Sequence, residues 1–382
     1  MSFPVDAWRD AIPAISEYDR IHFNNCSASP LPERGRKARR ECERVWMAEP
    51  NPWETWLAKV NESKRQFADL INADESEIAV LSCATQAIAQ VASAFDYDER
   101  DEVVLSDIEF PTVPQFWYAQ QQRRGAEIRF AESDDGLRVS TESYADAMSK
   151  RTKLVCTAHA YSFTGGLMDP KAVADEVHDR GGYFFLDAYQ SIGIVPIDVK
   201  AQDIDMLTAG TLKFLMGGPG IAYLYVDEDV ASELEPANMG WFSVEDIFGF
   251  ETEQHQYAAG ARRFEMGTPP APNAYQASAG MSVIQEVGVE TIRERVVEHT
   301  AHLIEGADDR GFSLRTPHEE SHRGGVVNVQ VTNPESAAER LMDDGICVST
   351  RAGGVRFSPH FYTTADDVTT GLDALAEHAT PT

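Results

Sequence analysis

Short apolar runs alternate with helical patterns between residues 77 and 226, and this alternation constrains the fold more than any other feature of the chain. The predicted strands cover residues 77–81, 103–106, 127–130, 152–158, 183–186, 205–208 and 221–226. Apolar residues at helical spacing are typical of the segments 87–95, 144–149 and 169–180 between them. Such alternation predicts an α/β domain built on a mostly parallel sheet.

The segments on either side predict more helices and a second, smaller unit. A short strand pattern at 20–23 and helical patterns at 32–47 and 56–71 come first, and helical patterns at 275–287 and 289–307 come later. The chain closes with strand patterns at 326–331, 346–350 and 355–357 and helical patterns at 335–344 and 365–377. We therefore expect an N-terminal segment over 1–25, a large domain over 26–270 and a small α+β domain over 271–382.

The charge balance is strongly acidic, since 33 Lys and Arg residues face 62 Asp and Glu residues for a formal net charge of −29. Only eight of the cations are lysine, and most of these, such as Lys64 beside Arg65, lie in segments that we expect to be solvated. The composition favours a halophilic protein, with an ordinary acidic cytosolic protein as the alternative. In both cases the surface charge disfavours binding to nucleic acid or to an anionic membrane.

The cysteines are scattered and show neither a CxxC motif nor metal-ligand spacing. They are Cys26, Cys42, Cys83, Cys156 and Cys347. This pattern favours a reducing compartment and predicts no metal site. The N-terminus lacks a basic region followed by an apolar one, and no apolar run approaches the length of a membrane span. We therefore expect a soluble, cytoplasmic protein.

Several chemically distinctive residues follow predicted strands, at the edge where an α/β sheet binds its ligands. Phe110, Thr164, Asp187 and Lys213 all lie at or just after such an end. Lys213 stands between an apolar run and the Gly/Pro cluster 217–220. An apolar pocket disfavours its ammonium form and leaves a nucleophilic amine suited to Schiff-base chemistry. The alternative is a lysine whose stem covers apolar surface while its head reaches water.

The segment Ser82–Gln86 joins a predicted strand to a predicted helix through a tight polar turn. Because the first N–H groups of a helix lack partners within the helix, this junction is a potential anion site. The alternative is an ordinary N-cap made by the side chain of Thr85 or Ser82.

Asp187 and Lys213 end two successive predicted strands, so a carboxylate and an amine are expected at neighbouring positions of one sheet edge. The pair is either a structural ion pair or the arrangement used with pyridoxal phosphate. In that second case the lysine forms a Schiff base and the acid holds the ring nitrogen protonated.

An ordered set of motifs over about residues 20–380 resembles the class V, fold-type I pyridoxal-phosphate enzymes. Asp187–Gln190 resembles their Asp-x-x-Gln element, and Lys213–Gly220 looks like the lysine segment of the kynureninases. Further matches are Phe110–Thr112, Gly240–Phe242, Ala261–Phe264, Gly267–Pro269 and Val355–Pro359. The motifs are most similar to those of kynureninase-like and cysteine desulfurase–selenocysteine lyase-like members. The resemblance implies a large domain with a mostly parallel sheet and a small C-terminal α+β domain.

The resemblance implies four roles around the cofactor ring. Lys213 forms the Schiff base and later serves as the base at Cα. Asp187 pairs with the pyridinium nitrogen, and Gln190 hydrogen-bonds the phenolic oxygen. Phe110 stacks on the ring face, where cysteine desulfurases carry a histidine.

The remaining matches are assigned to the phosphate and the substrate. The resemblance implies that Thr85, with the backbone near Ala84 and Gln86, binds the phosphate, in agreement with the predicted anion site. Trp241, and Thr268 reached from a second subunit, complete the phosphate site of a homodimer. A separate motif supplies the substrate contact, since Arg356 matches the arginine that clamps the substrate carboxylate.

The chain also departs from both families. Kynureninases usually carry a tyrosine before the lysine and an acid after Phe-Pro-Thr, where this chain has Leu212 and Val113. Their histidine three residues after the pyridine-binding acid is Gln190 here, as in cysteine desulfurases. Desulfurases place a catalytic cysteine on a loop after an arginine resembling Arg351, but the loop here has none. Cys347 precedes that arginine, and we expect it to be a buried, unreactive thiol.

These residues lead to an expectation of a pyridoxal-phosphate enzyme that acts on an α-amino acid. We expect a kynureninase-like lyase that breaks a Cβ–Cγ or a Cβ–heteroatom bond, without a persulfide. The first alternative is an aminotransferase of the same superfamily. The second is a catalytically silent binding protein for the cofactor, against which the intact Lys213, Asp187 and Arg356 argue.

Overall fold

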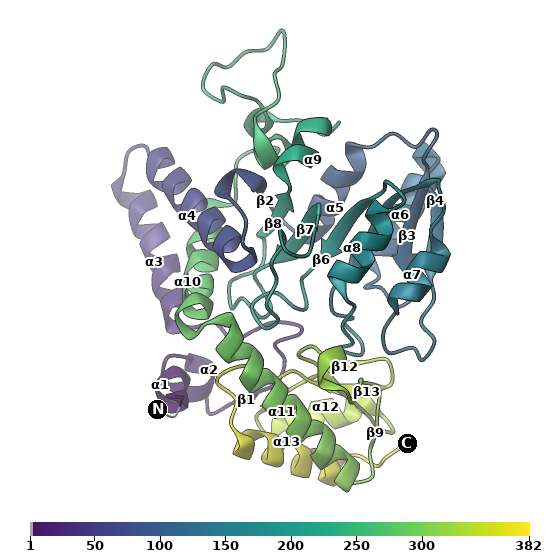
Figure 1. The fold of residues 1–382 in the computed structure, drawn as a ribbon. Helices are drawn as coiled ribbons and strands as arrows, with labels where there is room; N and C mark the ends of the chain where they lie inside the picture. Colours follow the sequence, from purple (N-terminus) through teal and green to yellow (C-terminus); the bar gives the residue numbers. More distant parts are fainter. Residues whose placement is uncertain (1–2) are drawn as a thin grey trace.

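A seven-stranded sheet forms the centre of the larger unit in the computed structural model, which describes residues 3–382 (Figure 1). The strand order is β2-β8-β7-β6-β5-β3-β4, and only β8 runs antiparallel to its neighbours. The strands are β2 (Ile78–Leu81), β3 (Glu102–Ser106), β4 (Glu127–Ala131), β5 (Thr152–Ala158), β6 (Tyr183–Asp187), β7 (Met206–Gly210) and β8 (Ala222–Val226). The sheet confirms the predicted mostly parallel α/β fold.

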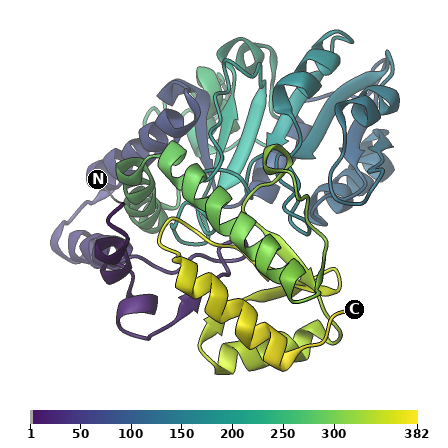
Figure 2. The same cartoon turned by 60° about the horizontal axis from the view of Figure 1, so that its bottom comes forward.

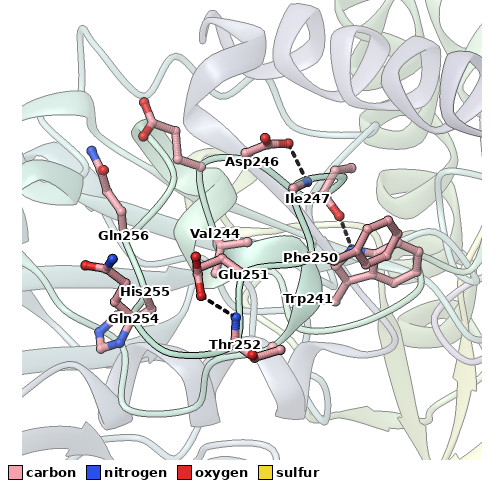
Figure 3. A pocket seen from close by; sticks show the side chains of 13 residues that line it. Trp241, Val244, Asp246, Ile247, Phe250, Glu251, Thr252, Gln254, His255 and Gln256 are labelled. Carbon is pink, nitrogen blue, oxygen red and sulfur yellow. Dashed lines mark hydrogen bonds between the residues drawn. The ribbon is translucent and has the colours of Figure 1, made fainter.

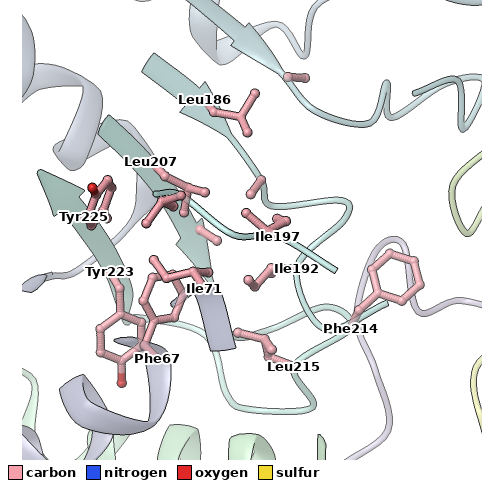
Figure 4. Packing of buried hydrophobic residues seen from close by; sticks show 14 of the residues in the cluster. Phe67, Ile71, Leu186, Ile192, Ile197, Leu207, Phe214, Leu215, Tyr223 and Tyr225 are labelled. Atoms are coloured by element: carbon pink, nitrogen blue, oxygen red, sulfur yellow. The ribbon is translucent and has the colours of Figure 1, made fainter. Parts of the chain in front are cut away.

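Helices cover both faces of this sheet because successive strand residues point to opposite sides. Phe184 packs in the core beneath α4, α7, α8 and α10, whereas Phe185 packs in the core beneath α5, α6 and α9. Figure 4 shows the first core, in which Phe67 and Ile71 of α4 meet Tyr223 and Tyr225 of β8. The helices of this unit are α3 (Glu33–Ala48), α4 (Trp53–Ile71), α5 (Ala84–Ser93), α6 (Thr112–Arg124), α7 (Thr141–Ala147), α8 (Pro170–His178), α9 (Glu228–Glu233) and α10 (Ala271–Val287).

The smaller unit is an antiparallel sheet in the order β12-β13-β10-β9, covered by helices (Figure 2). Its elements are α11 (Val289–Asp309), β9 (Ser313–Leu314), β10 (Val327–Gln330), α12 (Pro334–Asp343), β11 (Ile346–Cys347), β12 (Ser349–Arg351), β13 (Gly354–Phe357) and α13 (Ala365–His378). The N-terminal elements are α1 (Val5–Asp10), α2 (Pro13–Ser16) and β1 (Ile21–His22), and β1 pairs in parallel with β11. Short 3₁₀ turns occupy Glu75–Glu77, Trp241–Ser243, Gly260–Phe264 and Glu320–His322.

Most predicted elements are present, and the structure adds the short elements α1, α2, α9 and β9, which were not predicted. The pattern at 346–350 forms two short strands, β11 and β12, because they pair with different partners, β1 and β13. Helix α6 was not predicted, and its sequence carries a proline at position 114. The domain division at residue 270 stays a prediction, and α10 just after it packs against α3 and α4. Among residues 3–382, no helix is long and apolar enough to cross a membrane.

The expectation that Lys64 is solvated is wrong. Its side chain is 8% exposed, and its Nζ lies 3.2 Å from Oε1 of Glu265, itself 7% exposed. The same oxygen accepts a hydrogen bond of 3.1 Å from the backbone N–H of Val80 in β2. The pair therefore fixes the segment around Glu265 to the edge of the large sheet.

We predict that Lys64→Ala lowers the free energy of unfolding by about 3 to 5 kcal/mol, because it leaves the Glu265 carboxylate buried without its cation. Arg65→Ala is the matched control, since Arg65 pairs with Glu75 on the surface and its loss is expected to cost less than about 1 kcal/mol. Urea unfolding of both variants measures the difference. Equal stability of the two variants would contradict the prediction.

Candidate active site

Lys213 lies beyond the carboxyl end of β7, between two aromatic rings. Its Nζ is 4.3 Å from the ring centre of Tyr189 and 5.6 Å from that of Phe110. The surrounding cavity brings together four of the predicted site residues, and its lining consists of Phe110, Ala158, Ala160, Ser162, Asp187, Tyr189, Gln190 and Lys213. The parallel pairing of β6 with β7, which places Asp187 opposite Thr208, explains why Asp187 and Lys213 meet at one edge.

Burial dominates the electrostatics of this cavity. It lowers the pKa of Lys213 to about 8, and the charge of Asp187 opposes the shift only in part. Burial also raises the pKa of Asp187, against the opposing effects of the Tyr189 backbone N–H, which donates to Oδ1 at 2.9 Å, and of Lys213. Among residues 3–382 Lys213 has no ion pair within 4 Å. The neutral amine is therefore more populated at a given pH than that of an exposed lysine.

Helix α5 begins beside this cavity without a side-chain cap. The N-cap residue is Cys83, and no side chain accepts a hydrogen bond from the first turn. The proposed alternative, a cap by Thr85 or Ser82, is therefore wrong. Gln86 instead accepts hydrogen bonds from Ser82, at 2.9 Å from the backbone N and 2.8 Å from Oγ. The N–H groups of Ala84 and Thr85 are thus available to an anion.

Arg356 lies on β13 of the small unit and is 3% exposed. Its Nη1 donates to the carbonyl of Ser162 at 2.7 Å, and its Nη2 donates to Oγ of Ser349 at 3.0 Å. Its Nε has no partner among the described residues. The guanidinium is therefore held in place with a buried N–H free to donate to a carboxylate.

The N-terminal segment 24–29 crosses from one unit to the other at this site. Ser29 N donates to the carbonyl of Leu212 at 3.0 Å, and Asn25 Nδ2 donates to the carbonyl of Ser358 at 2.7 Å. Gln190 Nε2 donates to the carbonyl of Cys26 at 3.0 Å, while its Oε1 has no partner within residues 3–382. The segment thus connects the residue before Lys213 to the strand that carries Arg356.

Trp241 and Thr268 do not line the Lys213 cavity of this protomer, so their phosphate roles stay predictions. Trp241 donates from Nε1 to the carbonyl of Ile247, and its ring stacks on Phe250 in a surface loop (Figure 3). Thr268 is exposed. Its near neighbour Met266 accepts a weak hydrogen bond from Gln86 Nε2 at 3.0 Å. This contact brings the 266–268 segment next to the start of α5.

The departures from the family patterns have structural counterparts. Val113 is fully buried in the core beneath α6, where an acid would be costly. Cys347 is half-buried rather than buried as expected, and its partial burial raises the pKa of the thiol, which disfavours the reactive thiolate. Ala352 and Gly353, with φ values of 50° and 79°, form a tight turn between β12 and β13. This turn carries no cysteine, which is the departure from the desulfurase pattern noted in the sequence.

Three residues at the site were not predicted. Tyr189 occupies a variable position of the Asp-x-x-Gln motif, where only its aromatic character was a signal. Ser162 takes part through its backbone carbonyl, which a sequence does not reveal. Glu109 precedes Phe110 and is buried, with hydrogen bonds from Thr157 Oγ1 at 2.6 Å and Ala158 N at 3.0 Å. Burial raises its pKa to about 7.

We predict that an amine reagent labels Lys213 of the cofactor-free protein with a half-maximal rate near pH 8, because the neutral amine reacts and burial lowers its pKa to about 8. An unperturbed lysine has a pKa of about 10.4. Asp187→Asn removes the charge that opposes the shift and is expected to move the midpoint to lower pH. Peptide mapping measures the labelling, with Lys213→Ala as the control. A midpoint above pH 10 would contradict the prediction.

Comparisons with known proteins agree with this geometry. The profile of the family "Aminotransferase class-V" matches residues 52–370. The uncharacterized aminotransferase YcbU of Bacillus subtilis is 32% identical over 97% of each chain. A kynureninase of Bacillus thuringiensis subsp. konkukian is 27% identical over 85% of this chain and 78% of its own.

A solved structure gives the same result for the fold. The apo structure of a cysteine desulfurase from Thermococcus onnurineus NA1 superimposes with a TM-score of 0.89 at 25% identity, over 99% of this chain and 98% of its own. These matches confirm the resemblance to kynureninases and cysteine desulfurases and the fold-type I architecture. The chain belongs to the class V aminotransferase family, and its cofactor is pyridoxal 5'-phosphate.

Proposed function

We propose that this protein is a lyase that acts on an α-amino acid and breaks a bond at Cβ, either Cβ–Cγ or Cβ–heteroatom. The observation that carries the proposal is a cavity that contains both the Lys213 amine, whose pKa is lowered, and the carboxylate of Asp187. The tight turn at Ala352–Gly353 also lacks the cysteine that a desulfurase would need. The similarity to kynureninase favours Cβ–Cγ cleavage.

The residues fit the cofactor on the chemistry of their donors. Buried Asp187 matches a protonated ring nitrogen, and the uncapped first turn of α5 matches a phosphate. The exposed face of Phe110, with 43% of the residue accessible, is free to stack on a flat ring. Pyridoxal phosphate, when bound, supplies an electron sink for charge that develops at Cα.

The protein's own groups perform binding and proton transfer. Arg356 binds the substrate carboxylate through its free Nε–H and is oriented for this by Ser162 and Ser349. Lys213 Nζ removes the proton at Cα, a step suited to an amine whose pKa is near the working pH. Asp187 keeps the opposite end of the ring fixed through its carboxylate. The aromatic rings of Tyr189 and Phe110 flank the amine on two sides and limit its solvation.

A second candidate is an aminotransferase, which the name of the relative YcbU favours. In that reaction Lys213 returns the proton to the cofactor side rather than supporting cleavage at Cβ, and a keto acid leaves. The same cavity serves both reactions, so only the products distinguish them.

We predict that the purified protein with pyridoxal phosphate shows a visible absorption band that borohydride removes, and that Lys213→Ala abolishes this band because Nζ forms the Schiff base. Incubation with kynurenine, cysteine and alanine is expected to yield anthranilate or pyruvate without an added keto acid. Lys171→Ala is the control, since this lysine pairs only with the exposed carboxylates of Asp175 and Asp203. Product formation that depends on a keto acid would favour the aminotransferase, and a colourless protein would contradict the cofactor role of Lys213.

We also propose that the working form is a homodimer in which Thr268 completes the partner's phosphate site. Large apolar side chains are exposed around the Trp241 loop and at the end of α3, namely Phe248 at 58%, Phe250 at 70%, Trp46 at 61% and Met47 at 83%. A series of edge-to-face contacts connects the two patches. The ring centres are 5.3 Å apart for Trp46 and Trp56, 6.0 Å for Trp56 and Trp53, and 5.5 Å for Trp53 and Trp241. A second copy of the chain would cover this surface.

We predict that mixing Lys213→Ala with Thr268→Ala creates tight cofactor sites that neither variant has alone. In a mixed dimer one site receives Lys213 from one subunit and Thr268 from the other. Titration of the visible band at low pyridoxal phosphate, after unfolding and refolding the mixture, measures these sites. Thr332→Ala replaces Thr268→Ala in the control. If the titration of the mixture equals the sum of the two separate titrations, the proposal is contradicted. Thr268 would then act in the site of its own subunit or in neither site.

A further inference from the structure

Tyr189 is a large side chain at the centre of the site for which the family pattern has no assigned role. Its ring centre lies 4.3 Å from Nζ of Lys213, closer than that of Phe110. Its hydroxyl makes no hydrogen bond among residues 3–382, although neighbouring hydroxyls such as those of Tyr144 and Tyr161 bond each other at 2.8 Å. A phenol in this position is free to serve a ligand.

The hydroxyl end of the ring lies over the end of β7. A Cβ atom added to Gly210 would stand 2.6 Å from Cε2, Cζ and Oη of Tyr189. Since Cβ atoms in proteins essentially never approach other atoms so closely, position 210 accommodates this ring only as glycine. The packing of Gly210 against the phenol therefore fixes where the hydroxyl lies.

Tyr189 also lies near the uncapped start of α5. Helix α5 packs against β7, which ends at Gly210. Burial raises the pKa of Tyr189 to about 12, and both Asp187 and the N-cap residue Cys83 act in the same direction. Tyr189 therefore lies near both the ring-nitrogen site and the first turn of α5, where the N–H groups of Ala84 and Thr85 await an anion.

The residue at position 212 explains why the phosphate site needs another hydrogen-bond donor. The related kynureninases carry a phosphate-binding tyrosine just before the lysine, and this chain has Leu212, which has no polar group on its side chain. We propose that Tyr189 is a cofactor-binding residue whose hydroxyl donates a hydrogen bond to the cofactor phosphate, in place of the tyrosine missing at position 212. This role holds only if the Lys213 cavity binds pyridoxal phosphate as proposed above.

The test compares two ligands that differ only in the phosphate. Cofactor-free wild type and Tyr189→Phe are titrated with pyridoxal phosphate and with pyridoxal, followed by the visible band. Tyr189→Phe is expected to weaken the binding of pyridoxal phosphate about 10-fold to 100-fold, the range for one hydrogen bond to a charged group. The affinity for pyridoxal is expected to stay unchanged. Tyr183→Phe is the matched control, because that phenol lies at the other end of β6 and bonds Glu233.

A rescue variant keeps the test independent of folding defects. Tyr189→Phe combined with Leu212→Tyr is expected to regain most of the affinity for pyridoxal phosphate, because a phenol hydroxyl is then supplied from the loop after β7. Equal losses for pyridoxal and pyridoxal phosphate, or no loss for either, would overturn the role of the hydroxyl. A wild type without a visible band would instead overturn the cofactor role of Lys213, so the two failures are distinguishable.

Discussion

The desolvation of the Lys213 amine is the constraint on which the rest of the site depends. Two lysines of this protein, the buried Lys64 and the half-buried Lys213, show the effect by contrast. Lys64 contacts Glu265 directly at 3.2 Å and serves to hold a segment in place. Lys213 is enclosed by Tyr189 and Phe110 with no carboxylate in contact, so that its charge is only partly compensated. Burial with a partner makes a structural lysine, and burial without one makes a reactive lysine.

The sheet could be predicted from the sequence because most of its strands are buried on both faces. Residues 152–158 and 183–187 therefore read as nearly continuous apolar runs separated by helices. The orientation of β8 could not be predicted, because an apolar run has the same pattern in either direction. Helix α6 was missed because its apolar residues do not fall on one face and it carries Pro114.

The site was predictable where it depends on strand ends and not where it depends on long-range contacts. Asp187 and Lys213 follow successive strands, so their proximity is a consequence of the parallel sheet. Arg356 could be assigned only through the family resemblance, because it belongs to the smaller unit and contacts the cavity wall through the carbonyl of Ser162. The pairing of Lys64 with Glu265 joins segments 201 residues apart, and no local pattern distinguishes it from a solvated lysine.

The N-terminal segment 24–29 has a mechanical consequence. It is hydrogen-bonded to the carbonyl of Leu212 on one side of the cavity and to that of Ser358 on the other. It therefore links the loop that carries Lys213 to the end of the strand that carries Arg356. A displacement that separates Arg356 from Lys213 would have to break these hydrogen bonds. Six residues near the N-terminus therefore couple the positions of the two units at the cavity.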